Sequence, residues 1–376
     1  MRQFLVVIVS AVIIGICVSI VFNPPHLADE ILLSPYWTSA YPTEFSGTAQ
    51  SSGAETAAEG WAPLFLGDEL LFVHADGILG TLEKEDFYLH YTANSYVNIP
   101  REHTALTVRN YSGDSIMNLD GAGFPILSNS IIFMVSPDGF GVDAQDAEGN
   151  RLFSRRWASL VTTADIRRFD DDTMSAVGLL DGRVYVFVNA HEAVLSEPED
   201  SELSVLYGFA LHISENRGKT FVHLFTVEGF HSVLLRHQIF ECTEEGTLIP
   251  VGNISIPLLS QTTAMIPLTV FDNSVVLGRK KFAEVYSLYS SGQELSDVPV
   301  IIQGAGDFQY VWQNAELNMT IFSFADSLRS EIKMYTGAGM PLFSSLRSFA
   351  SAVWTEGSIM YQRNSGRVFL YRIEEG

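Results

Sequence analysis

A short proline motif recurs along this chain and limits the folds that it can adopt. In five places an apolar residue is followed by proline and two further apolar residues, and the prolines are Pro63, Pro125, Pro257, Pro299 and Pro341. The last three lie 42 residues apart, twice over. Pro63 and Pro125 are each followed 13 residues later by Asp-Gly. A period in the low forties indicates repetition of one supersecondary unit.

Each unit has the composition of short β-strands joined by tight turns. In the clearest copy, residues 121–157, strands over 131–135 and 140–144 flank the dipeptide Asp138-Gly139, and a third strand follows a glycine-containing turn. Asp-Gly between two such strands is a strong hairpin signal. Proline is tolerated as the first residue of a strand, where its missing N–H breaks no ladder hydrogen bond.

Units of four short strands with this period are typical of a β-propeller. At about 40–45 residues per blade, residues 60–376 suffice for seven or eight blades. We therefore predict an all-β fold, a β-propeller of about seven four-stranded blades. Because the chain ends on a strand, we expect ring closure, with the N- and C-terminal strands sharing one blade and leaving no exposed sheet edge. A non-repeating β-sandwich with chance prolines is the alternative.

The charge of the chain restricts its partners. It carries 22 Lys+Arg against 44 Asp+Glu, a formal charge of −22. Nucleic acids and anionic lipids require a basic surface, so we expect neither as a partner of the globular part. There are two cysteines, and Cys17 lies in the apolar N-terminus, which leaves Cys242 with no disulfide partner inside the folded part.

The N-terminus predicts a membrane anchor. The stretch that begins at Phe4 and ends at Phe22 has no charged residue, and at 1.5 Å per residue it is about 28 Å long. Only Arg2 precedes it, and no further Lys or Arg appears before Lys84, so the positive-inside rule places the N-terminus in the cytoplasm. We predict one transmembrane helix in residues 1–22, a flexible linker over 23–59 and a β-propeller domain over 60–376. A cleaved signal peptide and lipidation at Cys17 are the alternatives.

The order of elements in residues 124–153 resembles the bacterial quinoprotein-like (PQQ-like, WD40-like) β-propeller repeat. This order is proline, apolar strand, Asp-Gly, short strand, Asp, Gly and Leu-aromatic, with Phe153 where the family usually has Trp. The family includes the propeller subunit of the outer-membrane β-barrel assembly machinery and quinone-dependent alcohol dehydrogenases. The resemblance implies a protein of the bacterial cytoplasmic (inner) membrane with a periplasmic globular domain.

Motifs for catalysis and metal binding are absent from the sequence. It contains no G-x-S-x-G, no H-E-x-x-H and no adjacent cysteine pair of the kind found at the quinone site of the dehydrogenases. His231 and His237 share one side of a predicted strand, but six residues separate them by about 20 Å, too far for one metal ion. We therefore predict no catalytic residue, no cofactor and no metal site.

Two basic pairs beside aromatic residues are the candidate partner-binding residues. They are Arg155, Arg156 and Trp157, and Arg167 and Arg168 beside Phe169. Arginine and aromatic residues are enriched in interface hot spots; ordinary salt bridges to the abundant carboxylates are the alternative. By fold analogy, we expect a non-catalytic scaffold that binds another envelope protein through one propeller face or by strand addition. A propeller enzyme or small-ligand sensor that uses the central channel is the alternative.

Overall fold

The computed structural model describes strands within residues 31–91, most of residues 95–336 with their side chains, and strands within 341–375, with short gaps in each range. Every regular element in these ranges is a β-strand, which confirms the predicted all-β class. A membrane-crossing helix is not found among the described residues, and the stretch from Phe4 to Phe22 lies outside them.

The described strands pair into eight antiparallel sheets. The first sheet along the chain holds β2 (Trp61–Leu66), β3 (Glu69–His74) and β4 (Gly77–Glu83). The second holds β5 (Tyr88–Tyr91), β6 (Ser95–Ile99), β7 (Ala105–Asn110) and β8 (Ser115–Asp120). The third holds β9 (Phe124–Leu127), β10 (Ile131–Val135), β11 (Gly141–Asp146) and β12 (Arg151–Arg156). The fourth holds β13 (Val161–Phe169), β14 (Asp172–Leu179), β15 (Val184–Val188) and β16 (His191–Ser196).

The second half of the chain continues the series. The fifth sheet holds β17 (Val205–Asn216), β18 (Lys219–Gly229), β19 (Val233–Cys242) and β20 (Leu248–Pro257). The sixth holds β21 (Leu268–Phe271), β22 (Ser274–Gly278), β23 (Phe282–Tyr289), β24 (Glu294–Leu295) and β25 (Val300–Gln303). The seventh holds β26 (Asp307–Asn314), β27 (Met319–Ala325), β28 (Arg329–Thr336) and β29 (Pro341–Ser348). The eighth holds β30 (Val353–Glu356), β31 (Ile359–Asn364), β32 (Arg367–Glu375) and β1 (Ile31–Ala40).

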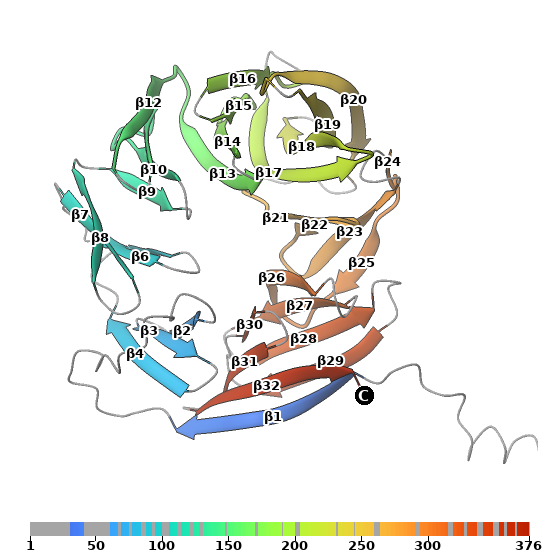
Figure 1. Cartoon of the computed structure of the whole chain (residues 1–376). Coiled ribbons are helices and arrows are strands. Elements are labelled where there is room, and N and C mark those ends of the chain that lie inside the picture. The colour runs from blue at the N-terminus through green and yellow to red at the C-terminus, as the bar shows by residue number, and fades with distance from the viewer. Residues whose placement is uncertain are drawn as a thin grey trace, which may run out of the picture.

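The sheets lie side by side around a ring in chain order (Figure 1). The first strands of neighbouring sheets contact each other, as β13 does with β17 and β17 with β21, and β2 contacts β30 where the ring closes. In a four-stranded sheet such as β9 to β12, each strand pairs with the next along the chain. The first strand therefore lies toward the ring axis and the last strand at the outside.

The ring is closed by terminal strands that share one sheet, as expected, but the N-terminal strand lies before the predicted propeller domain. β1 pairs antiparallel with β32 from Ile31 opposite Glu375 to Ala40 opposite Arg367. Here the structure differs from the predicted linker over 23–59, because these ten residues form a strand. The sequence shows no regular alternation at this point, since Pro35 interrupts it, and the register shifts between Pro35 and Trp37. A bulge of this kind accommodates proline within a strand.

The prediction of about seven blades is not confirmed, because eight sheets are described. The difference arises early in the chain. The first sheet occupies only residues 61–83 and the second only 88–120, and both are shorter than the 42-residue period used for counting.

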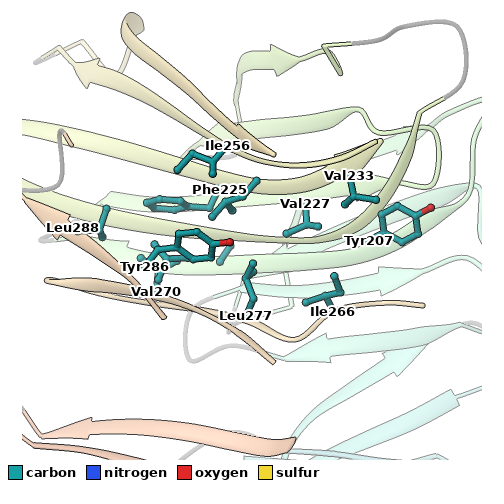
Figure 2. Packing of buried hydrophobic residues seen from close by; sticks show 13 residues of the cluster. Tyr207, Phe225, Val227, Val233, Ile256, Ile266, Val270, Leu277, Tyr286 and Leu288 are labelled. Carbon is teal, nitrogen blue, oxygen red and sulfur yellow. The ribbon is translucent and has the colours of Figure 1, made fainter. Parts of the chain in front are cut away.

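Apolar side chains fill the interfaces between neighbouring sheets. Along β18 successive side chains point to opposite faces. Phe225 and Val227 pack against Leu277 and Tyr286 of the β21–β25 sheet, as Figure 2 shows. The alternate residues, such as Leu224, pack on the other face with residues of the β13–β16 sheet. Because both faces are buried, the sequences of the middle strands are continuous apolar runs.

The predicted hairpin at Asp138-Gly139 is present. Gly139 has a φ of 75°, a conformation in which glycine has no steric cost, and its N–H donates to the carbonyl oxygen of Ser136 at 2.8 Å. Hydrogen bonds from Ser136 and Arg156 lower the pKa of Asp138, whose carboxylate also accepts from the N–H of Phe140. The strands β10 and β11 then pair from Val135 and Val142 onward.

Candidate functional site

One face of the ring is built from two kinds of loop: the turns between the second and third strands of a sheet, and the connections from each sheet to the next. We call it the connection face, and its described residues include 136–140, 157–160, 180–183, 197–199, 264–267 and 279–281. Backbone hydrogen bonds join these loops across sheets. The N–H of Leu180 donates to the carbonyl oxygen of Leu160 at 2.8 Å, and the N–H of Leu206 donates to that of Leu180 at 3.1 Å.

Three of the predicted partner-binding residues, Arg155, Arg156 and Trp157, lie at the connection face, where β12 ends. Arg156 pairs with Asp138, and Nη2 of Arg155 lies 3.8 Å from Oε2 of Glu192 on the next sheet. Trp157 is half-buried, with its ring 5.3 Å from that of Tyr185. Both arginines therefore have carboxylate partners, as the salt-bridge interpretation expects.

The second basic pair lies elsewhere. β13 starts at the connection face with Val161, and Arg167 is six residues further, about 20 Å along an extended strand. Its Nε lies 3.3 Å from Oδ1 of Asp165, and the side chain of Arg168 is outside the described residues. The two pairs are therefore at opposite ends of the sheets and do not form one surface.

Four exposed apolar side chains lie in loops of the connection face. Leu160 is 39% exposed, Leu180 40%, Phe230 54% and Met265 51%. They come from four loops that follow β12, β14, β18 and β20, and these strands belong to three neighbouring sheets. The sequence analysis did not identify them, because an apolar residue in a turn gives no signal until the turns are placed on one face.

A small cavity of about 110 Å³ lies beside Phe230 and is lined by Glu199, Ser204 and Glu228 among others. Glu228 is 1% exposed, and burial raises the pKa of its carboxyl group. Its oxygens accept hydrogen bonds from the N–H of Glu199 and from Thr226, both at 3.1 Å, and Nη1 of Arg236 lies 3.4 Å away. These bonds hold the acidic 197–199 segment against β18.

A chain of buried polar side chains crosses the fifth sheet. Oγ of Ser214 and Nε2 of His223 are hydrogen-bonded at 2.7 Å, and Nδ1 of His223 bonds Nε2 of His237 at 3.0 Å. The ring of His237 stacks on that of Phe225, with centroids 4.1 Å apart. His212 lies opposite His223 in the strand register, with Nε2 3.7 Å from Oδ1 of Asp272.

Burial keeps these imidazoles uncharged. It lowers the pKa of His223 to about 4 and that of His237 to about 3; His212 lowers both further, and His223 also lowers that of His237. A hydroxyl bonded to an imidazole is the geometry of an activated nucleophile, but a general base needs a pKa near the working pH. The geometry therefore favours a structural role. Among the described residues, no group of three or more His, Cys, Asp or Glu is arranged to hold a metal ion.

In the sequence, His237 was considered together with His231, which lies outside the described residues. The actual neighbours come from the hairpin of β17 and β18. Residues 217–218 join these two strands, and pairing outward from Asn216 opposite Lys219 places His212 opposite His223. The signal was therefore present in the hairpin register rather than in the spacing along one strand.

Antiparallel sheets arranged around a ring in chain order and closed by the terminal strands define a β-propeller. The chain belongs to a family described as beta-propeller protein, which matches residues 1–238. No curated protein matches this chain in sequence.

Several solved structures are similar to this chain. The Dos1 propeller is 11% identical with a TM-score of 0.52, over 91% of this chain and 95% of that one. BBS1N, solved in complex with ARL6DN, is 11% identical with a TM-score of 0.46, over 93% of this chain and 98% of that one. Hsv2 of Kluyvelomyces marxianus is 10% identical with a TM-score of 0.48, over 76% and 92%. At 11% identity, the similarity to the Dos1 propeller shows the fold alone.

Proposed function

We propose that this chain is a non-catalytic scaffold that binds another protein of the bacterial cell envelope through the connection face. The observation that carries the proposal is the set of exposed apolar side chains on that face, Leu160, Leu180, Phe230 and Met265. Apolar residues that gather on one surface mark sites of protein interaction. Burying them in an interface would contribute about 25 cal/mol for each Å² removed from water.

The predicted residues that lie on this face fit the edge of such an interface. Arg155, Arg156 and Trp157 end the third sheet at its margin, where exposed charges set the orientation and association rate of a partner. Arg167 and Arg168 belong to the opposite end of β13 and are not part of the proposed surface.

The proposed location is the cytoplasmic (inner) membrane, with the stretch from Phe4 to Phe22 as a single anchor and an eight-bladed propeller in the periplasm. The resemblance of residues 124–153 to the quinoprotein-like repeat supports an envelope protein. Alkaline phosphatase fused after Gly60 in a bacterial host should be active, because its disulfides form outside the cytoplasm. An inactive but expressed fusion would exclude this topology.

The binding surface is tested by crosslinking in intact membranes, followed by recovery of the full chain through a C-terminal tag. We expect one or two envelope proteins, and we expect Phe230→Glu to reduce their recovery at least tenfold, because a charge would replace an apolar anchor at the interface core.

The matched control is Ile249→Glu on the outer strand β20 of the same sheet. Ile249 is 49% exposed, close to the 54% of Phe230, so both substitutions place the same charge at a similarly exposed position. Equal loss with both variants, or unchanged recovery with Phe230→Glu, would contradict the assignment of the connection face.

A further inference from the structure

A cavity lies between the β21–β25 sheet and the β26–β29 sheet. Its volume is about 290 Å³. Its walls include Asn273 in the β21–β22 turn, Tyr289 where β23 ends and Gln313 near the end of β26. These positions are at the opposite face of the ring from the connection face. Any ligand of this cavity is therefore separate from the partner proposed above.

The described walls of this cavity are uncharged. Not one of the described lining residues is Asp, Glu, Lys, Arg or His, in a chain in which 18% of residues are charged. A charged ligand would lose hydration here without gaining a counter-charge, which is strongly unfavourable. The walls therefore select an uncharged ligand.

Neutral hydrogen-bonding groups reach the cavity from both sheets. Nε2 of Gln313 donates to Oδ1 of Asn273 at 2.9 Å, so two side-chain amides from neighbouring sheets meet at the wall. Hydroxyl groups of Ser287 and Thr320 line other parts of it. Such groups can donate to and accept from a ligand that carries hydroxyl groups.

Aromatic side chains form the apolar part of the walls. The rings of Phe322 and Tyr335 meet edge to face, with centroids 5.7 Å apart at 86°. Tyr289 stands at the mouth, where it is 53% exposed. Apolar walls with a few well-placed polar groups are the usual composition of a small-molecule site, and a volume near 300 Å³ is the lower end of the usual range.

We propose that this cavity binds an uncharged, polyhydroxylated ring, in the chemical class of a monosaccharide. The half-exposed ring of Tyr289 matches the C–H face of such a ring, and the amides and hydroxyls match its hydroxyl groups. The absence of charge among the described walls disfavours sugar acids and sugars with a free, protonated amino group.

The test uses the full chain and saturation-transfer NMR with four probes: glucose, galactose, N-acetylglucosamine and glucuronate. At least one neutral sugar should show transfer, and glucuronate should bind more weakly. Gln313→Leu should weaken binding of that sugar about tenfold through the loss of hydrogen bonds. Tyr289→Ala should weaken it as well, and because Tyr289 is half-exposed this change should leave the fold intact.

Gln309→Leu is the matched control, because Gln309 lies on the same strand, is exposed and bonds only the carbonyl oxygen of Asp307 among the described residues. It should leave sugar binding unchanged, and so should Phe230→Glu on the connection face. No transfer to any neutral sugar, equal binding of glucuronate, equal loss with Gln309→Leu, or binding of an uncharged peptide in place of every sugar would overturn the proposal. None of these results depends on the envelope partner.

Discussion

Acidification from pH 7 to pH 4 is expected to destabilise this protein on the order of 5 kcal/mol through two buried histidines. In the folded chain, burial lowers the pKa of His223 to about 4 and that of His237 to about 3. In the unfolded chain both titrate near 6.5. Below pH 6.5 the unfolded state binds more protons than the folded state, so each proton favours unfolding.

The stabilisation from this pair is thus fully present above about pH 6.5 and is lost as the pH falls toward the folded pKa values. Urea midpoints measured between pH 7.5 and pH 4.5 should show this loss. His237→Phe should flatten the pH dependence, because it removes one titrating group while a ring remains to stack on Phe225.

His191→Phe is the control, since His191 lies exposed on the outer strand β16. It should leave the slope of stability against pH as it is in the unaltered chain. Two results would show that the acid sensitivity has another origin. One is that His237→Phe leaves the slope of stability against pH unchanged. The other is that both variants change this slope equally.

The second large effect is expected on stability, when the guanidinium group of Arg279 is removed. Nη2 of Arg279 lies 3.3 Å from Oε2 of Glu284, and the Tyr286 hydroxyl donates to the same oxygen at 3.4 Å. The side chains of Arg279 and Glu284 are only 7% and 1% exposed. Arg279→Met leaves a buried carboxylate without its cation, so it should lower the free energy of unfolding by about 3–5 kcal/mol.

Adding Glu284→Leu to Arg279→Met should restore part of this stability, because no unpaired charge is then buried, although the Tyr286 hydroxyl loses its acceptor. The comparison is Lys219→Met, which breaks the Lys219–Glu241 pair with side chains 58% and 29% exposed. That change should cost at most about 1 kcal/mol. The measurement is urea unfolding at pH 7.5. If Arg279→Met lowers the free energy of unfolding as little as Lys219→Met does, the buried ion pair does not have the expected effect.

Local features of the fold were predictable from the sequence. Asp138-Gly139 predicted a hairpin, and Gly139 has a positive φ in the turn between the paired strands β10 and β11. These features depend on neighbouring residues, for which sequence patterns are informative. β1 was not predicted, because its evidence is a partner strand more than 300 residues away and not a local alternation.

The candidate sites were less predictable. Arg155 and Arg167 look equivalent in sequence, yet they lie at opposite ends of the sheets because β13 runs away from the connection face. The uncharged cavity combines side chains from two sheets, such as Asn273 and Gln313, that are 40 residues apart. No spacing rule brings such residues together until the order of sheets around the ring is fixed.

The pairing of β1 with β32 has a consequence for the chain during its synthesis. β1 ends at Ala40 and its partner begins at Arg367, so 327 residues must be translated after β1 before the two can meet. At 5–20 residues per second this takes roughly 15–65 s. Throughout that interval β1 lacks the strand that satisfies its backbone groups.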